Sequence, residues 1–182
     1  MKLLFPKPYA DFVARLRVPC GFVLVAAFAW FSNPDARSLV YGLPASLMGL
    51  AVRAWAAGHL AKNQTLATGG PYAHTRNPLY LGTLLVAAGL TIASRSAGLG
   101  ALFAAVFLCI YLPVIQLEQQ HLRSLFPEYA AYAARVPALL PRMTTAGEPR
   151  AFQCSLYVKN REYQAAAGFL AGALFLLWKA LR

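Results

Sequence analysis

Side chains that can do chemistry are concentrated in residues 69–82 of this 182-residue sequence. The segment begins with a Gly-Gly-Pro turn signal, and its backbone amides lack bulky side chains that would block a ligand. Hydrogen-bond donors and ring faces come from Tyr72, His74, Arg76 and Tyr80. Asn77-Pro78 starts an apolar stretch, which places Arg76 at a helix N-terminus, where anionic groups are favoured. We interpret the segment as a ligand-binding loop, although interfacial Tyr and Arg also anchor membrane spans.

Two charged residues in apolar surroundings are further candidates. Glu118 directly follows the apolar stretch 103–117, and a carboxylate at the end of a span needs a cation or a watery cavity. Glu118 is therefore either a functional residue of a site or an interfacial residue whose side chain extends toward water. Arg53 lies about one turn inside an apolar stretch, where it can pair with Glu118, hold an anionic ligand group or extend toward the interface. His74 is a candidate base, although a lone histidine is more often structural.

The elements that carry these residues are expected to be membrane-spanning helices. The sequence is 59% hydrophobic and 13% charged, whereas a soluble domain usually has about a quarter charged residues. A spanning helix needs about 20 mostly apolar residues. Five stretches approach this requirement: 18–31, 38–57, 78–94, 97–117 and 165–178, with Pro113 expected to kink the fourth. We expect five spans, with four spans and a surface helix as the alternative.

The basic residues predict the orientation of these spans. With the N-terminus in the cytoplasm, the cytoplasmic side carries Lys2, Lys7, Arg15, Arg17, Lys62, Arg76, Arg123, Arg135, Arg142, Arg150, Lys159 and Arg161. The opposite side carries only Arg37, Arg95, Lys179 and Arg182. Cytoplasmic connections are normally the ones rich in Lys and Arg. Both long connections, 58–77 and 118–163, then face the cytoplasm, and so does the expected active face.

An amphipathic helix follows the fourth span. Between residues 118 and 136, apolar side chains recur at three- and four-residue spacing. We expect a break near Phe126, a new helix opened by Pro127, and its end at Arg135-Val136-Pro137. This helix is expected to lie along the cytoplasmic interface.

Several kinds of site are not indicated. The net charge of +11 is scattered between apolar runs, so no nucleic-acid partner is predicted. There is no Gly-x-Gly-x-x-Gly run after a strand and no Gly-x-Ser-x-Gly motif. Cys20 and Cys109 lie in apolar runs, and Cys154 has no partner at metal-ligand spacing, so no metal site is predicted.

Two groups of motifs resemble one known family. Residues 65–72 (TLATGGPY) and 76–82 (RNPLYLG) form the first group. Residues 118–122 (EQQHL), 125–129 (LFPEY), Tyr132 and residues 135–141 (RVPALLP) form the second. Together they resemble the isoprenylcysteine carboxyl methyltransferase and phospholipid methyltransferase superfamily of integral membrane enzymes. The resemblance covers about residues 40–142.

The resemblance implies an enzyme that uses S-adenosylmethionine on the cytoplasmic side of the membrane. Carried over by position, the cofactor pocket is lined by Gln64, Thr65, Leu66, Ala67, Tyr72, Asn77, Pro78, Leu79 and Tyr80. Glu118 is then expected to hold the amino or ribose end of the cofactor. The acceptor, a lipophilic small molecule or a lipid-modified group, enters from the membrane lipids between spans. A carboxylate and aromatic faces also suit the sulfonium cation on physical grounds.

Two departures from the family pattern bear on the acceptor. The family's acidic motif usually has two adjacent glutamates, but Gln119 occupies the second position. Prenylcysteine enzymes have an arginine one helical turn before the first glutamate of this motif. This sequence has Val114 at that position. That arginine is associated with the acceptor carboxylate, so Arg53 and Arg76 are the candidates to position the acceptor instead.

The sequence therefore predicts an all-α, polytopic membrane bundle of about five transmembrane helices and one cytoplasmic interfacial helix. Residues 1–182 form a single domain, with a family-like core at 40–142 and an extra helix near 165–180. The leading hypothesis is methyl transfer, preferably to oxygen. The alternatives are a phospholipid N-methyltransferase, a sterol-reductase-like NADPH enzyme and a non-enzymatic lipid-binding protein. No oligomeric state is predicted.

Overall fold

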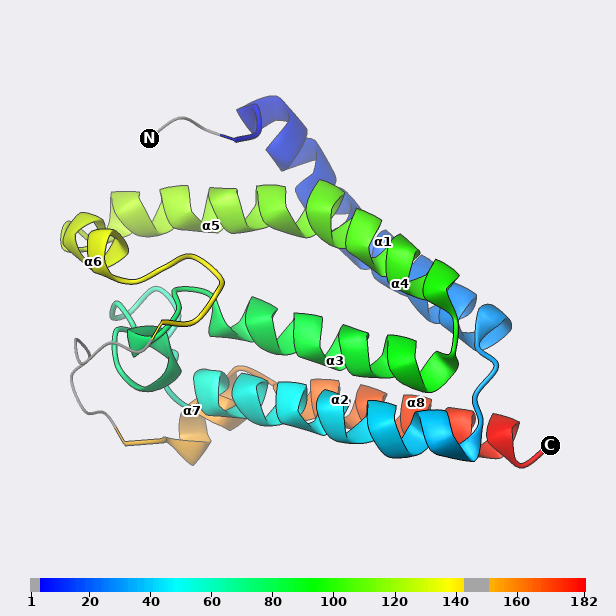
Figure 1. The fold of residues 1–182 in the computed structure, drawn as a ribbon. Coiled ribbons are helices and arrows are strands. Elements are labelled where there is room, and N and C mark those ends of the chain that lie inside the picture. Colours follow the sequence, from blue (N-terminus) through cyan, green and yellow to red (C-terminus); the bar gives the residue numbers. More distant parts are fainter. Residues whose placement is uncertain (1–3, 143–150) are drawn as a thin grey trace.

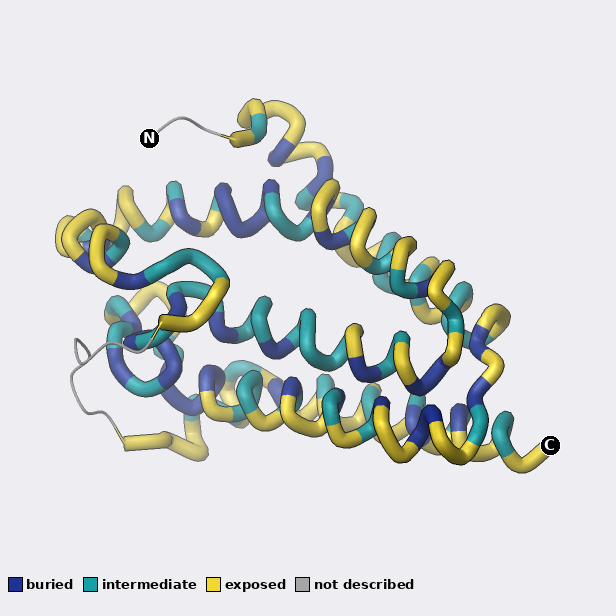
Figure 2. The backbone as a smooth tube through the Cα atoms, viewed as in Figure 1, coloured by how far each residue is buried: buried dark blue, intermediate teal, exposed yellow. Residues whose placement is uncertain are grey.

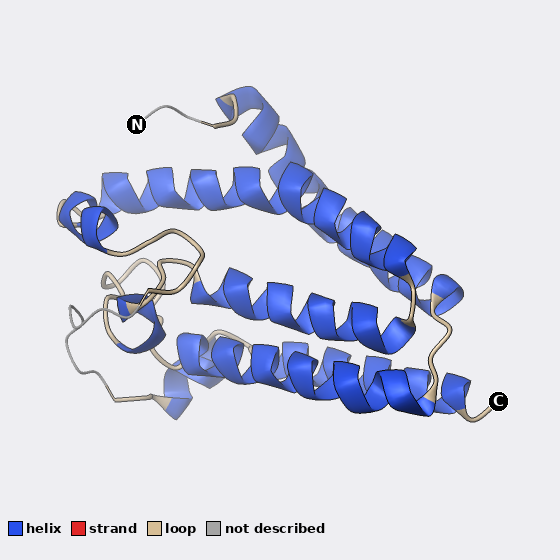
Figure 3. Cartoon of the chain, in the orientation of Figure 1, coloured by secondary structure: helices blue, strands red, loops and turns tan. Residues whose placement is uncertain are grey.

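The computed structural model describes residues 4–142 and 151–182, and these ranges contain helices but no β-strand (Figures 1 and 3). The elements, in chain order, are α1 (Lys7–Phe31), α2 (Ala36–Ala57), the 3-10 turn η1 (Gly70–Ala73), α3 (Pro78–Ser94), α4 (Ala97–Val106), the π-helical turn η2 (Phe107–Tyr111), α5 (Leu112–Leu125), α6 (Tyr129–Arg135), α7 (Cys154–Lys159) and α8 (Tyr163–Ala180). The all-helical fold class is confirmed. Lys2 and Arg150, two of the basic residues that predict orientation, lie outside the described residues.

The long helices run side by side, and the short elements gather at one end of the bundle (Figure 1). That end carries η1, α6, α7 and the connection 58–77, which we call the loop end. The start of α1 lies on the side of the loop end, and the end of α8 lies at the opposite end of the bundle (Figure 1). The arrangement brings the two motif groups together at the loop end.

Within residues 4–142 and 151–182, three helical stretches are long and apolar enough to cross a membrane: α1, α2 and the continuous stretch Ala97–Leu125. α3 is apolar but shorter. Many large apolar residues are exposed, for example Trp30 and Phe22, which are 81% and 73% exposed. Figure 2 shows exposed residues along the long helices. Contiguous apolar surface of this kind suits a lipid environment. The structure is that of a membrane protein, and the count of five spans stays a prediction.

Two predicted spans were too short. The first helix begins at Lys7 rather than Val18, because Pro6 and Pro8 are well placed in a first helical turn and the polar residues that follow continue the helix. The last one covers Tyr163–Ala180 rather than 165–178. The predicted bounds of the second and third spans agree with α2 and α3 to within two residues.

α2 and α3 pack closely because small residues face each other along both helices. A Cβ atom added to Gly89 would lie 2.5 Å from the carbonyl oxygen of Gly42, and one added to Gly82 would lie 2.7 Å from that of Gly49. Ser46 donates a hydrogen bond across the same interface to the carbonyl of Val86 at 3.0 Å. Small residues allow helix backbones in membranes to approach each other in this way. The packed pair holds the residues of both helices at the loop end in fixed positions.

The fourth predicted span is interrupted by the π-helical turn η2 before Pro113. Proline lacks the N–H that would reach back to the carbonyl of Cys109, and that carbonyl accepts a hydrogen bond from the Tyr9 hydroxyl at 2.8 Å. Single π turns inside helices often occur at functional sites. Here the turn carries Tyr111, whose ring packs edge-on against Tyr80 at 6.1 Å between centroids.

The predicted break near Phe126 and the predicted helix end at Arg135 are confirmed. α6 begins at Tyr129 rather than at Pro127, since residues 127 and 128 form a turn. The inner face of α6 buries Tyr129, Tyr132 and Val136 in one apolar cluster. This cluster fixes α6 over the loop end.

The C-terminal segment, whose role the sequence leaves open, caps α2. The side chain of Asn160 donates hydrogen bonds to the carbonyls of Ala57 and Leu60, at 2.9 and 2.8 Å. The backbone N–H of Gln153 donates to the carbonyl of Gly58 at 3.0 Å. These bonds satisfy carbonyls that a helix leaves unpaired at its C-terminus.

Candidate functional site

A cavity of about 540 Å³ lies at the loop end. Its walls come from α1, α2, the connection 60–67, η1, α3, η2, α5 and α6. Both motif groups, together with residues of α1 and α2, therefore contribute to one cavity. The cavity is large enough for a nucleoside-sized cofactor, since small-molecule sites usually measure about 300–1,000 Å³.

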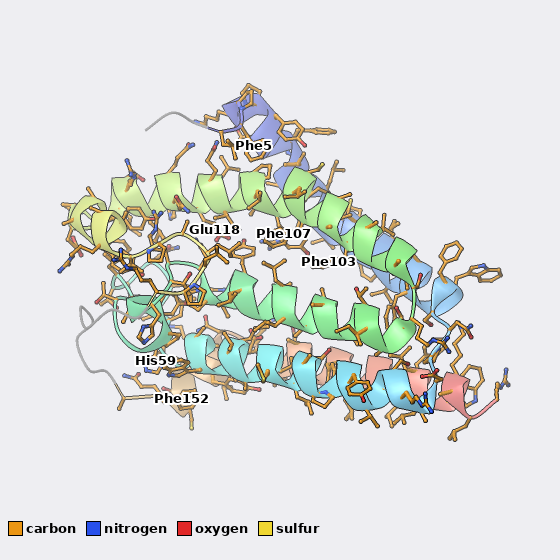
Figure 4. All side chains as sticks on the ribbon, in the orientation of Figure 1. Phe5, His59, Phe103, Phe107, Glu118 and Phe152 are labelled. Carbon is orange, nitrogen blue, oxygen red and sulfur yellow. The ribbon has the colours of Figure 1, made fainter. Side chains whose placement is uncertain are left out.

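Glu118 supplies a carboxylate to this cavity. It lies in the middle of α5, and Figure 4 shows it pointing into the space between α5 and α3. Its Oε1 accepts a hydrogen bond from the Tyr80 hydroxyl at 3.0 Å. Arg17 and Lys62, which also line the cavity, both interact electrostatically with this carboxylate. The carboxylate is accessible to a bound molecule and is oriented by Tyr80.

Tyrosine rings form much of the remaining wall. The cavity is lined by Tyr72, Tyr80, Tyr111, Tyr129 and Tyr132, together with Phe126. The Tyr132 hydroxyl donates to the backbone carbonyl of Tyr72 at 2.7 Å, which ties α6 to η1. Aromatic faces beside a carboxylate are the surroundings that a sulfonium or ammonium cation prefers.

Two buried polar atoms on the cavity wall have no hydrogen-bond partner among the described residues. These atoms are the Tyr72 hydroxyl and the Arg76 Nε. Leaving such a group unpaired costs about 1–3 kcal/mol. Burial raises the pKa of Tyr72, and the nearby Tyr132, Glu118 and Glu162 raise it further, so its hydroxyl keeps the proton that it can donate. The two atoms are therefore donors beside the cavity that are unpaired among the residues the structure describes.

Arg53 does not pair with Glu118, which corrects one of the three options that the sequence leaves open. Its Nε and Nη2 both donate to the carboxylate of Glu162, the latter at 3.1 Å. The guanidinium still lines the cavity. Only 8% of Glu162 is exposed.

The cavity brings together most of the residues predicted as site residues. Those on its wall are Arg53, Thr65, Leu66, Ala67, Tyr72, Arg76, Leu79, Tyr80 and Glu118. Gln64, Asn77 and Pro78 are not on the wall. Asn77 instead donates from its side chain to the carbonyl of Ala138 at 2.6 Å, which holds the segment after α6 against the start of α3. Binding of a cofactor by any of these residues stays a prediction.

His74 and the two residues that depart from the family motif, Gln119 and Val114, do not line the cavity. The Nδ1 of His74 lies 3.2 Å from the carbonyl oxygen of Arg142, and His74 does not line the cavity. Gln119 is buried, and its side-chain oxygen lies 3.5 Å from the Nη1 of Arg76. Val114 is buried away from the cavity wall, so its position offers no charge to an acceptor.

Sequence reasoning missed several residues of the wall. They are Arg17, Lys62, Tyr111, His121, Tyr129 and Tyr132. Tyr129 and Tyr132 were predicted as positions of the amphipathic helix and belong to the second motif group, but neither was predicted as a site residue. Arg17 was counted only as a basic flank. The sequence carries no signal that α1 packs beside α5.

Tyr72 and Tyr132 form a matched pair for testing the cavity. Tyr72→Phe removes a hydroxyl that has no partner, so we expect unchanged or slightly higher stability and about fivefold weaker ligand binding. Tyr132→Phe removes a hydrogen bond, so we expect about 1 kcal/mol lower stability. Thermal unfolding and cofactor titration of both variants measure this. A stability loss in Tyr72→Phe equal to that in Tyr132→Phe would show that the Tyr72 hydroxyl is bonded within the protein.

The fold and the cavity define a helical membrane protein with a polar, aromatic-lined site at one end of its bundle. A family model described as phospholipid methyltransferase matches residues 38–129, which include most of α2 and the whole of α3, α4 and α5. This chain belongs to the phospholipid methyltransferase family. The resemblance inferred from the motifs is thereby confirmed at the level of the superfamily.

Two relatives carry names that refer to metal resistance. The cobalt-zinc-cadmium resistance protein CzcN of Cupriavidus metallidurans is 39% identical over 135 residues, which is 70% of this chain and 62% of the relative. The nickel-cobalt-cadmium resistance protein NccN of Alcaligenes xylosoxydans xylosoxydans is 33% identical over 151 residues, 76% of this chain and 71% of the relative. No solved structure matches the chain significantly. Among the described residues, no group of three or more His, Cys, Asp or Glu side chains could hold a metal ion.

Proposed function

We propose that this protein is an S-adenosylmethionine-dependent methyltransferase that acts on a lipophilic acceptor at the membrane, preferably by O-methylation. The observation that carries the proposal is the loop-end cavity, in which one accessible carboxylate faces a wall of tyrosines. Family membership independently supports methyl transfer. O-methylation and N-methylation of a lipid remain separate outcomes of the experiments below.

The residues present fit S-adenosylmethionine. When bound, the cofactor supplies a methyl group on a positively charged sulfur. The tyrosine rings and Glu118 would surround that positive charge and the amino group. The Nε of Arg76 and the Tyr72 hydroxyl would donate to the cofactor's carboxylate and hydroxyl oxygens. Because transfer depends mainly on alignment of nucleophile, methyl carbon and sulfur, this chain contributes binding and orientation more than proton transfer.

A second cavity supports a lipophilic acceptor. It measures about 660 Å³, its lining is almost entirely apolar, and it lies between α1, α3, α4 and α8. Thr83 lines both this cavity and the loop-end cavity. An apolar chain in the second cavity would therefore present its polar end next to the cofactor site.

The membrane orientation is part of the same proposal. We take α1, α2, α3, the stretch 97–125 and α8 as five spans, which agrees with the start of α1 and the end of α8 lying at opposite ends of the bundle (Figure 1). The basic loop end then faces the cytoplasm, where the cofactor is made. The relatives' names supply a cellular context, and we propose that the methylated product serves metal resistance.

The cofactor assignment is tested by titrating the purified protein in lipid nanodiscs with S-adenosylmethionine in a calorimeter. We expect saturable binding with a dissociation constant in the range of about 1 µM to 1 mM, the range typical of enzyme substrates. NADPH, titrated in parallel, is expected not to bind. Saturable binding of NADPH alone would instead identify a sterol-reductase-like enzyme, and binding of neither would leave the proposal without its cofactor.

A further inference from the structure

The ion pair between Arg53 and Glu162 lies where the two cavities meet. Arg53 lines the loop-end cavity, and its Nη1 donates to the Oγ1 of Thr83, the residue that lines both cavities. The same nitrogen lies 3.4 Å from the carbonyl oxygen of Leu79. The guanidinium is therefore held at the place where the polar end of an acceptor would meet the cofactor site.

Glu162 leaves Arg53 with little capacity for an anion. An arginine carries five N–H donors. Nε and one donor of Nη2 go to Glu162, and both donors of Nη1 go to Thr83 and Leu79. One Nη2 donor has no partner among the described residues. The carboxylate of Glu162, of which only 8% is exposed, also balances the positive charge.

We propose that Glu162 makes the acceptor site selective for a lipophile with an uncharged polar end, namely a hydroxyl group. Methyl transfer to that hydroxyl would form an O–CH3 bond, break the S–CH3 bond of the cofactor and release the hydroxyl proton to water. The remaining N–H of Arg53 donates to that neutral oxygen, whereas a carboxylate or phosphate would meet a guanidinium already paired with an anion. Glu162 acts through Arg53 and is a positioning residue. It lies outside the matched family region 38–129, so this selectivity is a property of the C-terminal segment of this chain. The inference deepens the proposed function and uses its acceptor cavity.

Retention of a matched pair of lipids tests the inference without the cofactor. The protein is incubated with equal amounts of hexadecanol and palmitate, which share a chain length and differ in charge, then washed, and the retained lipids are quantified by mass spectrometry. We expect wild type to retain about tenfold more hexadecanol, and Glu162→Gln, which leaves Arg53 uncompensated, to reverse the ratio. Preference of wild type for palmitate, or an unchanged ratio in folded Glu162→Gln, would overturn the inference.

Two further variants complete the experiment. The double variant Arg53→Met/Glu162→Leu keeps an apolar, uncharged pair, so it covers the case in which Glu162→Gln does not fold. This variant has no guanidinium to bind an anion, so we expect it to retain hexadecanol over palmitate as wild type does, and a preference for palmitate in this variant would contradict the inference. Gly172 lines the apolar cavity and has open space beside it, so Gly172→Leu is expected to lower retention of both lipids equally. The lipid ratios can be measured even if the protein does not bind S-adenosylmethionine. Absence of cofactor binding would therefore contradict the proposed function but not the selectivity of the acceptor site.

Discussion

Replacing Glu118 with glutamine is expected to weaken S-adenosylmethionine binding by about 10- to 100-fold, the effect of losing a charge-assisted contact worth about 1.5–3 kcal/mol. Glu118 is the one carboxylate that lines the loop-end cavity, as the described residues define it. A glutamine oxygen can still accept the hydrogen bond from Tyr80, so the fold is expected to persist. Calorimetric titration in nanodiscs measures the loss.

Glu128→Gln is the matched control. Glu128 is exposed in the turn before α6 and does not line the cavity. The same change of charge is therefore expected to leave the affinity for S-adenosylmethionine unchanged. Equal affinities of wild type and Glu118→Gln for S-adenosylmethionine would show that Glu118 does not bind the cofactor. An equal loss of affinity in Glu118→Gln and Glu128→Gln would indicate a general effect of the protein's charge.

Replacing Arg53 with methionine is expected to lower the free energy of unfolding by about 3 kcal/mol. The change leaves the carboxylate of Glu162 buried without a counter-ion, and breaking a buried pair from one side typically costs about 3–5 kcal/mol. We expect a loss at the lower end of this range, because the side chain of Arg53 is 23% exposed and solvent screens its interaction with Glu162. Denaturant unfolding followed by tryptophan fluorescence measures the effect.

The double variant Arg53→Met/Glu162→Leu is expected to recover most of this stability, since well-packed apolar residues can replace a buried ion pair at little cost. The expected recovery distinguishes an unpaired buried charge from a packing defect. A double variant that is less stable than Arg53→Met alone would show that Glu162 stabilises α8 through other contacts.

The helices that carry the site could be predicted because local signals define their ends. Asp35 and Ser38 form a reciprocal capping box at the start of α2. Pro78 occupies the first position of α3, and Arg95 ends that helix in the left-handed conformation. Glu118 and the 65–80 segment were found from residue type and motif spacing. These features depend on neighbours in sequence, which a single chain displays directly.

The remaining parts of the site depend on contacts between distant segments. Glu162 lies 109 positions from Arg53, and no local pattern distinguishes it from a solvated glutamate in a connection. Arg17 reaches the cavity only because α1 packs beside α5 and η2. Both residues lie outside the matched family region, so the motifs carried no information about them. Their roles follow from packing alone.

The most direct measurement of the central claim is methyl transfer itself. Purified protein in nanodiscs made from bacterial lipid extract is incubated with S-adenosylmethionine that carries a labelled methyl group, and the organic-extractable fraction is counted. The proposal predicts time-dependent label in that fraction and at least tenfold less with Glu118→Gln; a hydroxyl acceptor would give a methyl ether, whose label resists mild base. Label that enters the lipid fraction equally with wild type and Glu118→Gln, or no label in the presence of confirmed cofactor binding, would contradict it.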